Sequence, residues 1–239
     1  MDLAVFGANG PTGRQVVRQA LTAGHHVTAV TRRPDEYPLT SPHLDVVTAD
    51  VTDPDGVGRV LSGPQAVIST FGVPYSKNEI TVYSQGIANI TRAMTIHSVK
   101  RLVCVSSTTV ATEEAPGESL FWRKVVIPLL RNTVGRTLYD DMQRMEDIVR
   151  SSGLDWTVVR PAGLFDAAEP SDDYEVAPRR LPGRYTSRAD LAETLIREAT
   201  EPQHLRSTIE VITRSGLPLP MTTFLKEAFG IGAQSAMNP

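Results

Sequence analysis

Apolar residues gather in short runs along the chain, and polar or glycine-containing segments separate these runs. Runs this short are typical of buried strands. They predict strands at Leu3–Phe6, His26–Thr31, Asp45–Ala49, Ala66–Ser69, Leu102–Val105 and Leu154–Val159. Between them apolar residues recur at helical spacing, which predicts helices from Thr12 to about Gly24, over Ile80–His97 and over Tyr139–Ser152. Strands that alternate with helices predict an α/β fold built on a doubly wound parallel sheet.

The remaining segments extend this pattern. Asp53 or Thr52 is expected to cap a short helix that ends at Leu61. A loop-rich stretch runs to Arg184, and Ser187 to Asp190 then opens a helix in the manner of a capping box, with Asp190 in place of the usual glutamate. A late strand at Thr208–Ile212 and a last short helix at Thr222–Phe229 complete the prediction.

The segment Pro116–Thr137 differs from the rest, because aromatic and aliphatic residues mix there with arginine and lysine. We expect a helical insertion broken near Pro128. A lid over a substrate, a membrane-surface element, part of a dimer interface and a plain packed helix all fit this composition. The chain shows no repeat and no linker, so we expect one domain over residues 1–239.

Three glycines follow the first predicted strand at fixed spacing, in the order Gly7, Gly10 and Gly13. A strand, a glycine turn and a helix form the context in which such glycines bind a dinucleotide in a Rossmann-type fold. The first allows a sharp turn, the second lets the backbone approach a pyrophosphate, and the third lets the helix pack close to the sheet. The spacing departs from the commoner G-x-G-x-x-G, and an ordinary glycine turn is the alternative.

The end of the second strand bears on the choice of dinucleotide. Sites for NAD commonly place an acid there to bind the ribose 2′-hydroxyl, whereas sites for NADP place an arginine there. Here Arg32 and Arg33 follow Thr31 directly. A guanidinium matches a 2′-phosphate in charge and geometry, so we expect NADPH to be preferred over NADH. The alternative is a solvated, charged loop.

Ligands of such sheets lie at the carboxyl ends of the strands. The ends of the third, fourth and fifth predicted strands therefore contribute further candidates: Asp50 and Val51, then Thr70, Phe71 and Gly72, then Ser106 and Ser107.

Composition narrows the classes of function. The formal net charge is −3, which disfavours a nucleic-acid partner. One cysteine, Cys104, excludes an internal disulfide, and it is expected to be buried. The histidines show no metal-ligand spacing, and no apolar run approaches the ~20 residues that cross a bilayer. The first strand begins at the second residue without a signal peptide, so a cytoplasmic protein is expected.

Several motifs together resemble a known family. They are GANGPTG, the strand end at Arg32, the run VSST, and the stretches YDDMQRMEDIVRSSGLDWTVVRPAGLFD and SRADLAE. From Leu3 to about Ala199 the chain is similar to the atypical short-chain dehydrogenases/reductases with an NAD(P)H-binding, NmrA-like fold, and in particular to their flavin and biliverdin-IXβ reductases.

The resemblance implies roles for individual residues. NADPH would lie on the loop formed by Gly7, Asn9, Gly10, Pro11, Thr12 and Gly13, with its 2′-phosphate on Arg32. Asp50 and Val51 would border the adenine, and Thr70, Phe71 and Gly72 would flank the ribose and pyrophosphate. Ser106 and Ser107 follow the fifth strand, with Ser107 beside the nicotinamide. Pro161, Ala162 and Gly163 would form a loop that closes over it.

The chain departs from the family at two places. Gly163 stands where the flavin reductases carry a histidine, and the Tyr-x-x-x-Lys pair of typical short-chain dehydrogenases is missing. The nearest tyrosine, Tyr139, is followed four residues later by Gln143, and Met142 occupies the position where many relatives keep lysine. Since that lysine lowers the pKa of the tyrosine for proton exchange with a carbonyl oxygen, alcohol–ketone chemistry is disfavoured. Tyr139 remains a candidate proton donor.

Three functions remain open from the sequence. The first is an NADPH-dependent reductase that passes hydride to a small conjugated acceptor such as a flavin or quinone. The side chains that would face this acceptor are those of Phe71, Phe121, Trp122, Leu164 and Phe165, and burial in the core is the alternative for each. The second is a non-catalytic sensor of NADP(H). The third is a carbonyl or enoyl reductase of a biosynthetic pathway. A homodimer is a further expected partnership.

Overall fold

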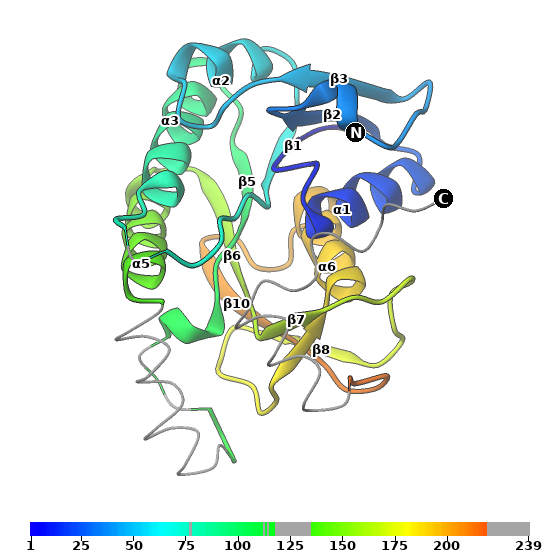
Figure 1. The fold of residues 1–239 in the computed structure, drawn as a ribbon, viewed down its shortest axis with the longest axis vertical. Helices are drawn as coiled ribbons and strands as arrows, with labels where there is room; N and C mark the ends of the chain where they lie inside the picture. The colour runs from blue at the N-terminus through cyan, green and yellow to red at the C-terminus, as the bar shows by residue number, and fades with distance from the viewer. Residues whose placement is uncertain (77, 112, 114, 118–134, 219–239) are drawn as a thin grey trace.

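The computed structural model describes residues 1–76, 78–111, 113, 115–117 and 135–218. These residues form an α/β fold around an eight-stranded sheet with the strand order β3-β2-β1-β4-β5-β6-β10-β8 (Figure 1). All neighbouring strands pair in parallel except β10 and β8. A doubly wound Rossmann-type sheet is therefore confirmed.

The strand bounds agree with the apolar runs to within about two residues, and β2 and β4 match them fully. The main sheet contains β1 (Asp2–Phe6), β2 (His26–Thr31), β3 (Leu44–Thr48), β4 (Ala66–Ser69), β5 (Arg101–Val105), β6 (Asp155–Pro161), β8 (Tyr174–Ala177) and β10 (Ser207–Thr213). A small second sheet pairs β7 (Gly163–Phe165) with β9 (Tyr185–Ser187).

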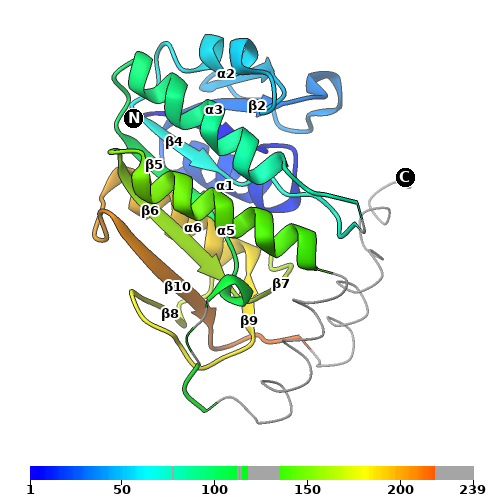
Figure 2. The same ribbon diagram turned by 90° about the vertical axis from the view of Figure 1, so that its left-hand side faces the viewer.

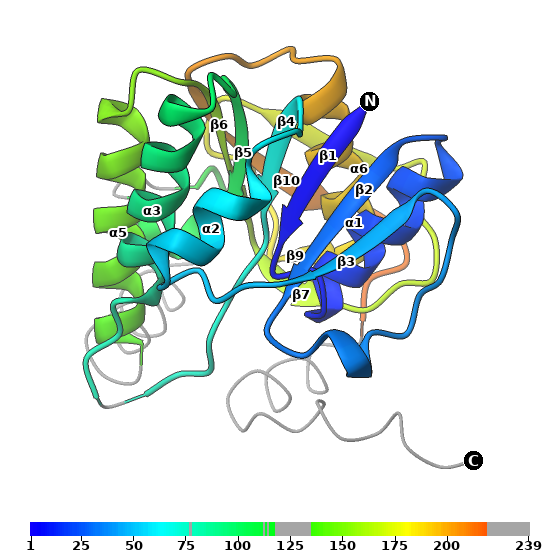
Figure 3. The same cartoon turned by 90° about the horizontal axis from the view of Figure 1, so that it is seen from above.

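The helices form one layer on each face of the sheet. They are α1 (Pro11–Thr22), α2 (Pro54–Val60), α3 (Val82–Ile96), α5 (Arg136–Ser151) and α6 (Arg188–Thr200). Helices α1 and α6 pack together on one face, whereas α2, α3 and α5 cover the other (Figures 2 and 3). Two apolar clusters result, one on each side of the sheet, and Phe6 and Val5 of β1 belong to opposite clusters because successive strand side chains alternate in direction. Cys104 is fully buried, as expected.

The helix termini show how local sequence sets the boundaries. The carboxylate of Asp53 accepts a hydrogen bond from the N–H of Asp55, so Asp53 and not Thr52 caps α2. The hydroxyl of Ser187 accepts from the N–H of Asp190, as expected for the start of α6. The reciprocal half of the capping box does not form, because Asp190 accepts hydrogen bonds from Ser171 and Thr213 instead.

The loop-rich stretch before Arg184 contains structure that the sequence pattern does not indicate. Strand β7 follows β6 almost directly, and β8 adds to the edge of the main sheet antiparallel to β10. Of the expected insertion, residues 118–134 lie outside the described residues, and α5 already begins at Arg136. The expected last helix at residues 222–229 also lies outside them.

Candidate functional site

Backbone register brings the predicted site residues to one edge of the sheet. Phe6 of β1 aligns with Val30 on one side and Ser69 on the other. Ser69 in turn aligns with Cys104, and Val105 with Val159. Because the strands are parallel, the segments after each of these residues emerge at the same edge, where a dinucleotide lies in this type of sheet.

The glycine turn adopts a conformation that two of its glycines require. Gly7 has a φ of +78°, and a Cβ there would lie 2.5 Å from the backbone nitrogen of Phe71. At Gly13 a Cβ would lie 2.2 Å from the carbonyl oxygen of Gly7. Gly10 differs, because a Cβ there would meet the carbonyl oxygen of Gly7 at 3.3 Å and nothing else within 4 Å. The first and third glycines therefore serve packing, while the second borders open space.

Among the described residues, no side chain caps the N-terminus of α1. Gly10 is its N-cap and supplies no side chain, Pro11 has no N–H group, and the first turn holds no acid. The N–H groups of Thr12 and Gly13 thus belong to the unsatisfied donors of a first helical turn. Arg14 lies beside this turn and donates two hydrogen bonds to the side-chain oxygen of Asn9, at 3.0 and 2.7 Å.

The two arginines after β2 differ in their surroundings. The Arg32 side chain is 77% exposed, and its guanidinium lies 3.8 Å from a carboxylate oxygen of Asp50. The Arg33 guanidinium instead pairs with Glu36 at 3.0 Å. The N–H and hydroxyl of Thr52 hold the pKa of Asp50 below its ordinary value, with a smaller contribution from Arg32. Arg32 and Asp50 therefore lie next to each other after β2 and β3, at the edge of the sheet where the sequence places both.

A glycine of α3 shapes the same region. A Cβ at Gly86 would lie 2.9 Å from the ring of Phe71 and 3.0 Å from the side chain of Val51. The side-chain amide of Asn89 donates to the carbonyl oxygen of Val51 at 2.9 Å. Gly86 and Asn89 thus position two predicted site residues. The sequence signal for Gly86 is a glycine inside a helical pattern, which commonly marks close packing.

Phe71 packs toward α3 and not into open space. Its ring lies 6.0 Å from that of Tyr83, centroid to centroid. The hydroxyl of the neighbouring Thr70 donates to the carbonyl oxygen of Phe6 at 3.0 Å, which fastens the end of β4 to β1. Gly72 follows and is exposed. Phe165, another aromatic candidate, packs edge-on against Tyr185.

The two serines after β5 point in different directions. The buried Ser106 hydroxyl donates to the carboxylate of Glu146 on α5 at 2.6 Å, so this side chain fastens the helix to the sheet. Ser107 is half-buried, and its hydroxyl oxygen accepts from the N–H of Thr109 at 3.2 Å. Among the described residues its hydroxyl proton has no acceptor and could be donated to a ligand.

The segment Pro161–Gly163 follows β6 at the same edge. Pro161 is buried as the last residue of that strand. The N–H of Ala162 donates to the hydroxyl of Thr186, and the N–H of Gly163 donates to the carbonyl oxygen of Arg184, both at 3.0 Å. The backbone of the segment is thus fastened to the strand β9 region.

Tyr139 lies near the start of α5 and is buried. Its hydroxyl lies 2.8 Å from that of Tyr75, in the segment after β4. Met142 is half-buried and packs against the apolar cluster on this side of the sheet, which agrees with a core role. Sequence reasoning missed Tyr75, because no pattern links two tyrosines that far apart.

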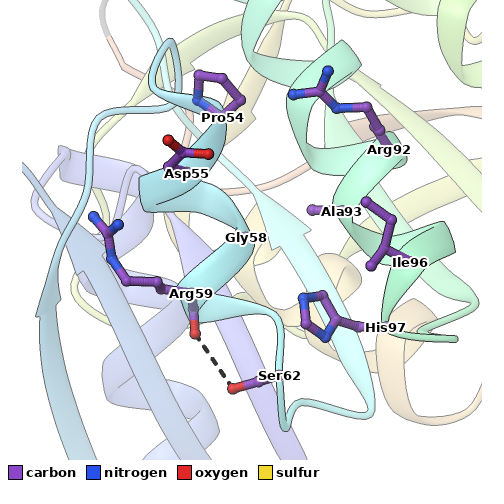
Figure 4. A pocket seen from close by; sticks show the side chains of 9 residues that line it. All are labelled: Pro54, Asp55, Gly58, Arg59, Ser62, Arg92, Ala93, Ile96 and His97. Atoms are coloured by element: carbon purple, nitrogen blue, oxygen red, sulfur yellow. Dashed lines mark hydrogen bonds between the residues drawn. The ribbon is translucent and has the colours of Figure 1, made fainter.

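A cavity of about 780 Å³ lies elsewhere, between α2 and α3 (Figure 4). Arg59 on α2, Arg92 on α3 and His97 just after α3 flank it, and no predicted site residue lines it. In the part of the chain that the structure describes, no group of three or more acidic, histidine or cysteine side chains is arranged to hold a metal, and no helix is long and apolar enough to span a membrane.

The sheet order, the glycine turn and the uncapped N-terminus of α1 together define a Rossmann-type dinucleotide-binding protein. Comparison with known proteins refines this class. The NAD(P)H-binding family matches residues 7–202, so the chain belongs to that family.

The chain is also similar to one relative in sequence and to two solved structures in fold. The chain is 30% identical over 225 residues to an uncharacterized chloroplastic protein of Arabidopsis thaliana, which covers 90% of this chain and 77% of that protein. Its fold is similar to that of a wide-type short-chain dehydrogenase/reductase from Veillonella parvula in complex with NADP, with a TM-score of 0.73 and 18% sequence identity. The alignment covers 90% of this chain and 95% of that chain. The fold is also similar to that of ChuY, an anaerobillin reductase from Escherichia coli O157:H7, with a TM-score of 0.72 and 19% sequence identity. That alignment covers 92% of this chain and 100% of ChuY.

Proposed function

We propose that this protein is an NADPH-dependent reductase that transfers hydride to a conjugated acceptor, such as a flavin or a quinone. The observation that carries the proposal is the arrangement of one edge of the sheet. It holds an uncapped helix N-terminus beside open space at Gly10, the exposed Arg32 and the half-buried hydroxyl of Ser107.

Each of these groups has a role in binding NADPH. The N–H groups of Thr12 and Gly13 would bind the pyrophosphate, with which no acid in the first turn competes. Arg32 would bind the 2′-phosphate; its contact with Asp50 is long at 3.8 Å and exposed, so that little free energy opposes the exchange. Gly7 and Gly13 hold the loop in shape.

The reduced nicotinamide, when bound, supplies the hydride, and the protein orients it. Ser107 would hold the nicotinamide or the acceptor through its hydroxyl proton. Reduced flavins and quinols can take their proton from water, so this chemistry needs no Tyr–Lys pair. The absence of lysine at both candidate positions, which are occupied by Met142 and Gln143, agrees with such chemistry. The anaerobillin reductase activity of the structural neighbour ChuY is in keeping with a conjugated acceptor.

Two alternatives each have an observation in their favour. The missing Tyr–Lys pair also suits a protein that binds NADP(H) without turnover and signals its redox state. The contact between the hydroxyls of Tyr139 and Tyr75 suits a carbonyl or enoyl reductase, since Tyr75 is partly exposed and could relay a proton to Tyr139.

Anaerobic NADPH oxidation against a panel of flavins, quinones, enones and ketones tests the proposal, with NADPH binding measured by calorimetry in parallel. We expect micromolar binding and oxidation that depends on a flavin or quinone. Binding without oxidation by any acceptor would favour the sensor, and oxidation by ketones or enones alone would favour the third reading.

A further inference from the structure

A second cavity, of about 380 Å³, lies directly beside the turn that Ser107 begins. Residues of α5, β6, β10 and the segment between β8 and β9 line it, and these elements neighbour one another in Figures 1 and 2. Val110 and Ala111, which follow Ser107 in the chain, form part of its wall. The cavity lies on the α5 face of the sheet, next to the position proposed for the nicotinamide.

Cationic side chains dominate this cavity. Its lining includes four arginines and two glutamates: Arg150, Arg160, Arg179, Arg180, Glu113 and Glu210. Glu113 is exposed, whereas the Arg160 and Arg180 side chains are only 14% and 12% exposed. Glu210 is buried as well, so the buried part of the lining holds two guanidinium groups and one carboxylate.

Each of these arginines pairs with a carboxylate. Arg150 and Arg160 share one buried carboxylate, that of Glu146, which also accepts the hydroxyl of Ser106. Arg180 pairs with Glu210. Arg150 also pairs with the exposed Asp147, and Arg179 pairs with Glu175, both at 3.0 Å. An anion in the cavity would therefore bind through guanidinium N–H groups that these carboxylates leave unused.

Arg180 also carries an unsatisfied donor. Its Nε–H group is buried and finds no hydrogen-bond acceptor among the described residues. A buried, charged donor without a partner costs free energy, and an anion in the adjoining cavity is the ligand that would satisfy it. Other parts of the same guanidinium are fixed, since Nη1 donates to the carbonyl oxygen of Thr108 at 3.3 Å.

That contact joins the cavity to the proposed reaction site, because Thr108 is the residue after Ser107. We propose that the cavity binds an anionic substituent, a phosphate or a carboxylate, of the acceptor whose ring system lies beside Ser107. This inference rests on the proposed function. It narrows the acceptor class to conjugated molecules that carry an acidic side arm.

Flavins offer a matched pair of probes, because FMN and riboflavin share the reacting ring and differ in the terminal phosphate. We expect a KM for FMN at least tenfold lower than that for riboflavin in steady-state NADPH oxidation. Inorganic phosphate should raise the KM for FMN more than that for riboflavin, whereas competition at the 2′-phosphate site of NADPH would affect both flavins equally.

Variants of the lining connect this preference to the cavity. Arg180→Gln should reduce the FMN preference to less than threefold. Because Arg180→Gln also leaves Glu210 without its guanidinium and can fail to fold, Gln143→Glu provides a second test. Gln143 lines the cavity from α5, and among the described residues its side chain donates a hydrogen bond to Asp147 alone. Arg197→Gln is the control, because it lowers the charge by the same amount on the exposed surface of α6.

Fluorescence titration of FMN and riboflavin against the NADP⁺-loaded protein separates this inference from the proposed function. Tighter FMN binding that Gln143→Glu abolishes would support the cavity even if no flavin were reduced. Equal KM values and equal dissociation constants for the two flavins would overturn it while leaving a reductase intact. A preference that persists in Gln143→Glu, or no binding of either flavin, would also overturn it.

Discussion

The hydroxyl of Tyr139 on α5 lies 2.8 Å from the hydroxyl of Tyr75, and the two rings meet edge to face with centroids 6.2 Å apart. The Tyr139 side chain is 7% exposed, whereas Tyr75 is 37% exposed. The contact fastens the start of α5 to the segment after β4, so a structural role suffices to explain why Tyr139 is buried here.

This contact predicts an energetic coupling between the two residues. Tyr139→Phe and Tyr75→Phe should each destabilise the protein by about 0.5–1.5 kcal/mol, the usual contribution of one hydrogen bond. Urea unfolding of both single variants and the double variant measures the coupling. Additive losses would show that the hydroxyls do not interact.

Arg32 sets the expected preference for NADPH. Arg32→Ala should weaken NADPH binding by about 1.5–3 kcal/mol, the range for a hydrogen bond to a charged group, and leave NADH binding nearly unchanged. Arg33→Ala is the matched control, because Arg33 pairs with Glu36. Calorimetric titration of both cofactors measures the two affinities. An equal loss of affinity for NADH and NADPH in Arg32→Ala would contradict the role of Arg32 in binding the 2′-phosphate.

The glycine turn yields opposite predictions for two of its glycines. Gly10→Val should leave the protein folded and abolish binding of NADPH, because the position has extended backbone and its added side chain would enter the proposed pyrophosphate site. Gly13→Ala should lower the free energy of unfolding itself, because its Cβ would collide with the backbone of Gly7 and Ala8. Thermal unfolding measures the stability of both variants, and calorimetry measures their binding of NADPH. Binding of NADPH by Gly10→Val would contradict the prediction.

Buried tyrosines predict a loss of stability at high pH. Burial raises the pKa of Tyr83 to about 12, so the folded state holds this proton more tightly than the unfolded chain, whose tyrosines titrate near 10. The associated stability is present below about pH 10 and is lost as the pH rises toward 12. Tyr83→Phe should reduce the slope of unfolding free energy against pH in that range. An unchanged slope would mean that Tyr83 does not contribute.

The sequence was sufficient for the architecture of the sheet because strands that are buried on both faces give uninterrupted apolar runs, as in Ala66–Ser69. It was insufficient for β8, which pairs on one side only and whose four residues, Tyr-Glu-Val-Ala, form no uninterrupted apolar run. The short strands β7 and β9 form only by pairing with each other, although they lie far apart in the sequence. No local sequence pattern indicates such a pair.

The site divides in the same way. Positions fixed by local backbone geometry, such as Gly7 and the end of β2, could be predicted from spacing alone. The contacts that individual side chains make could not be predicted in this way. Ser106 follows a strand as Ser107 does, yet it is directed to Glu146, because a buried carboxylate on α5 requires donors. Asp141 is similarly buried on α5, where its carboxylate accepts hydrogen bonds from the N–H groups of Tyr83 and Ser84 at the start of α3.

The most direct test of the proposed reductase is the ranking of two variants on whichever acceptor supports NADPH oxidation. Ser107→Ala should reduce kcat/KM more than Tyr139→Phe does, by up to ~10²-fold, because loss of orientation between nicotinamide and acceptor slows hydride transfer. Tyr139→Phe should change turnover little, since water supplies the proton. A loss of ~10²–10⁴-fold for Tyr139→Phe, the size expected of a general acid, with little loss for Ser107→Ala, would contradict this account.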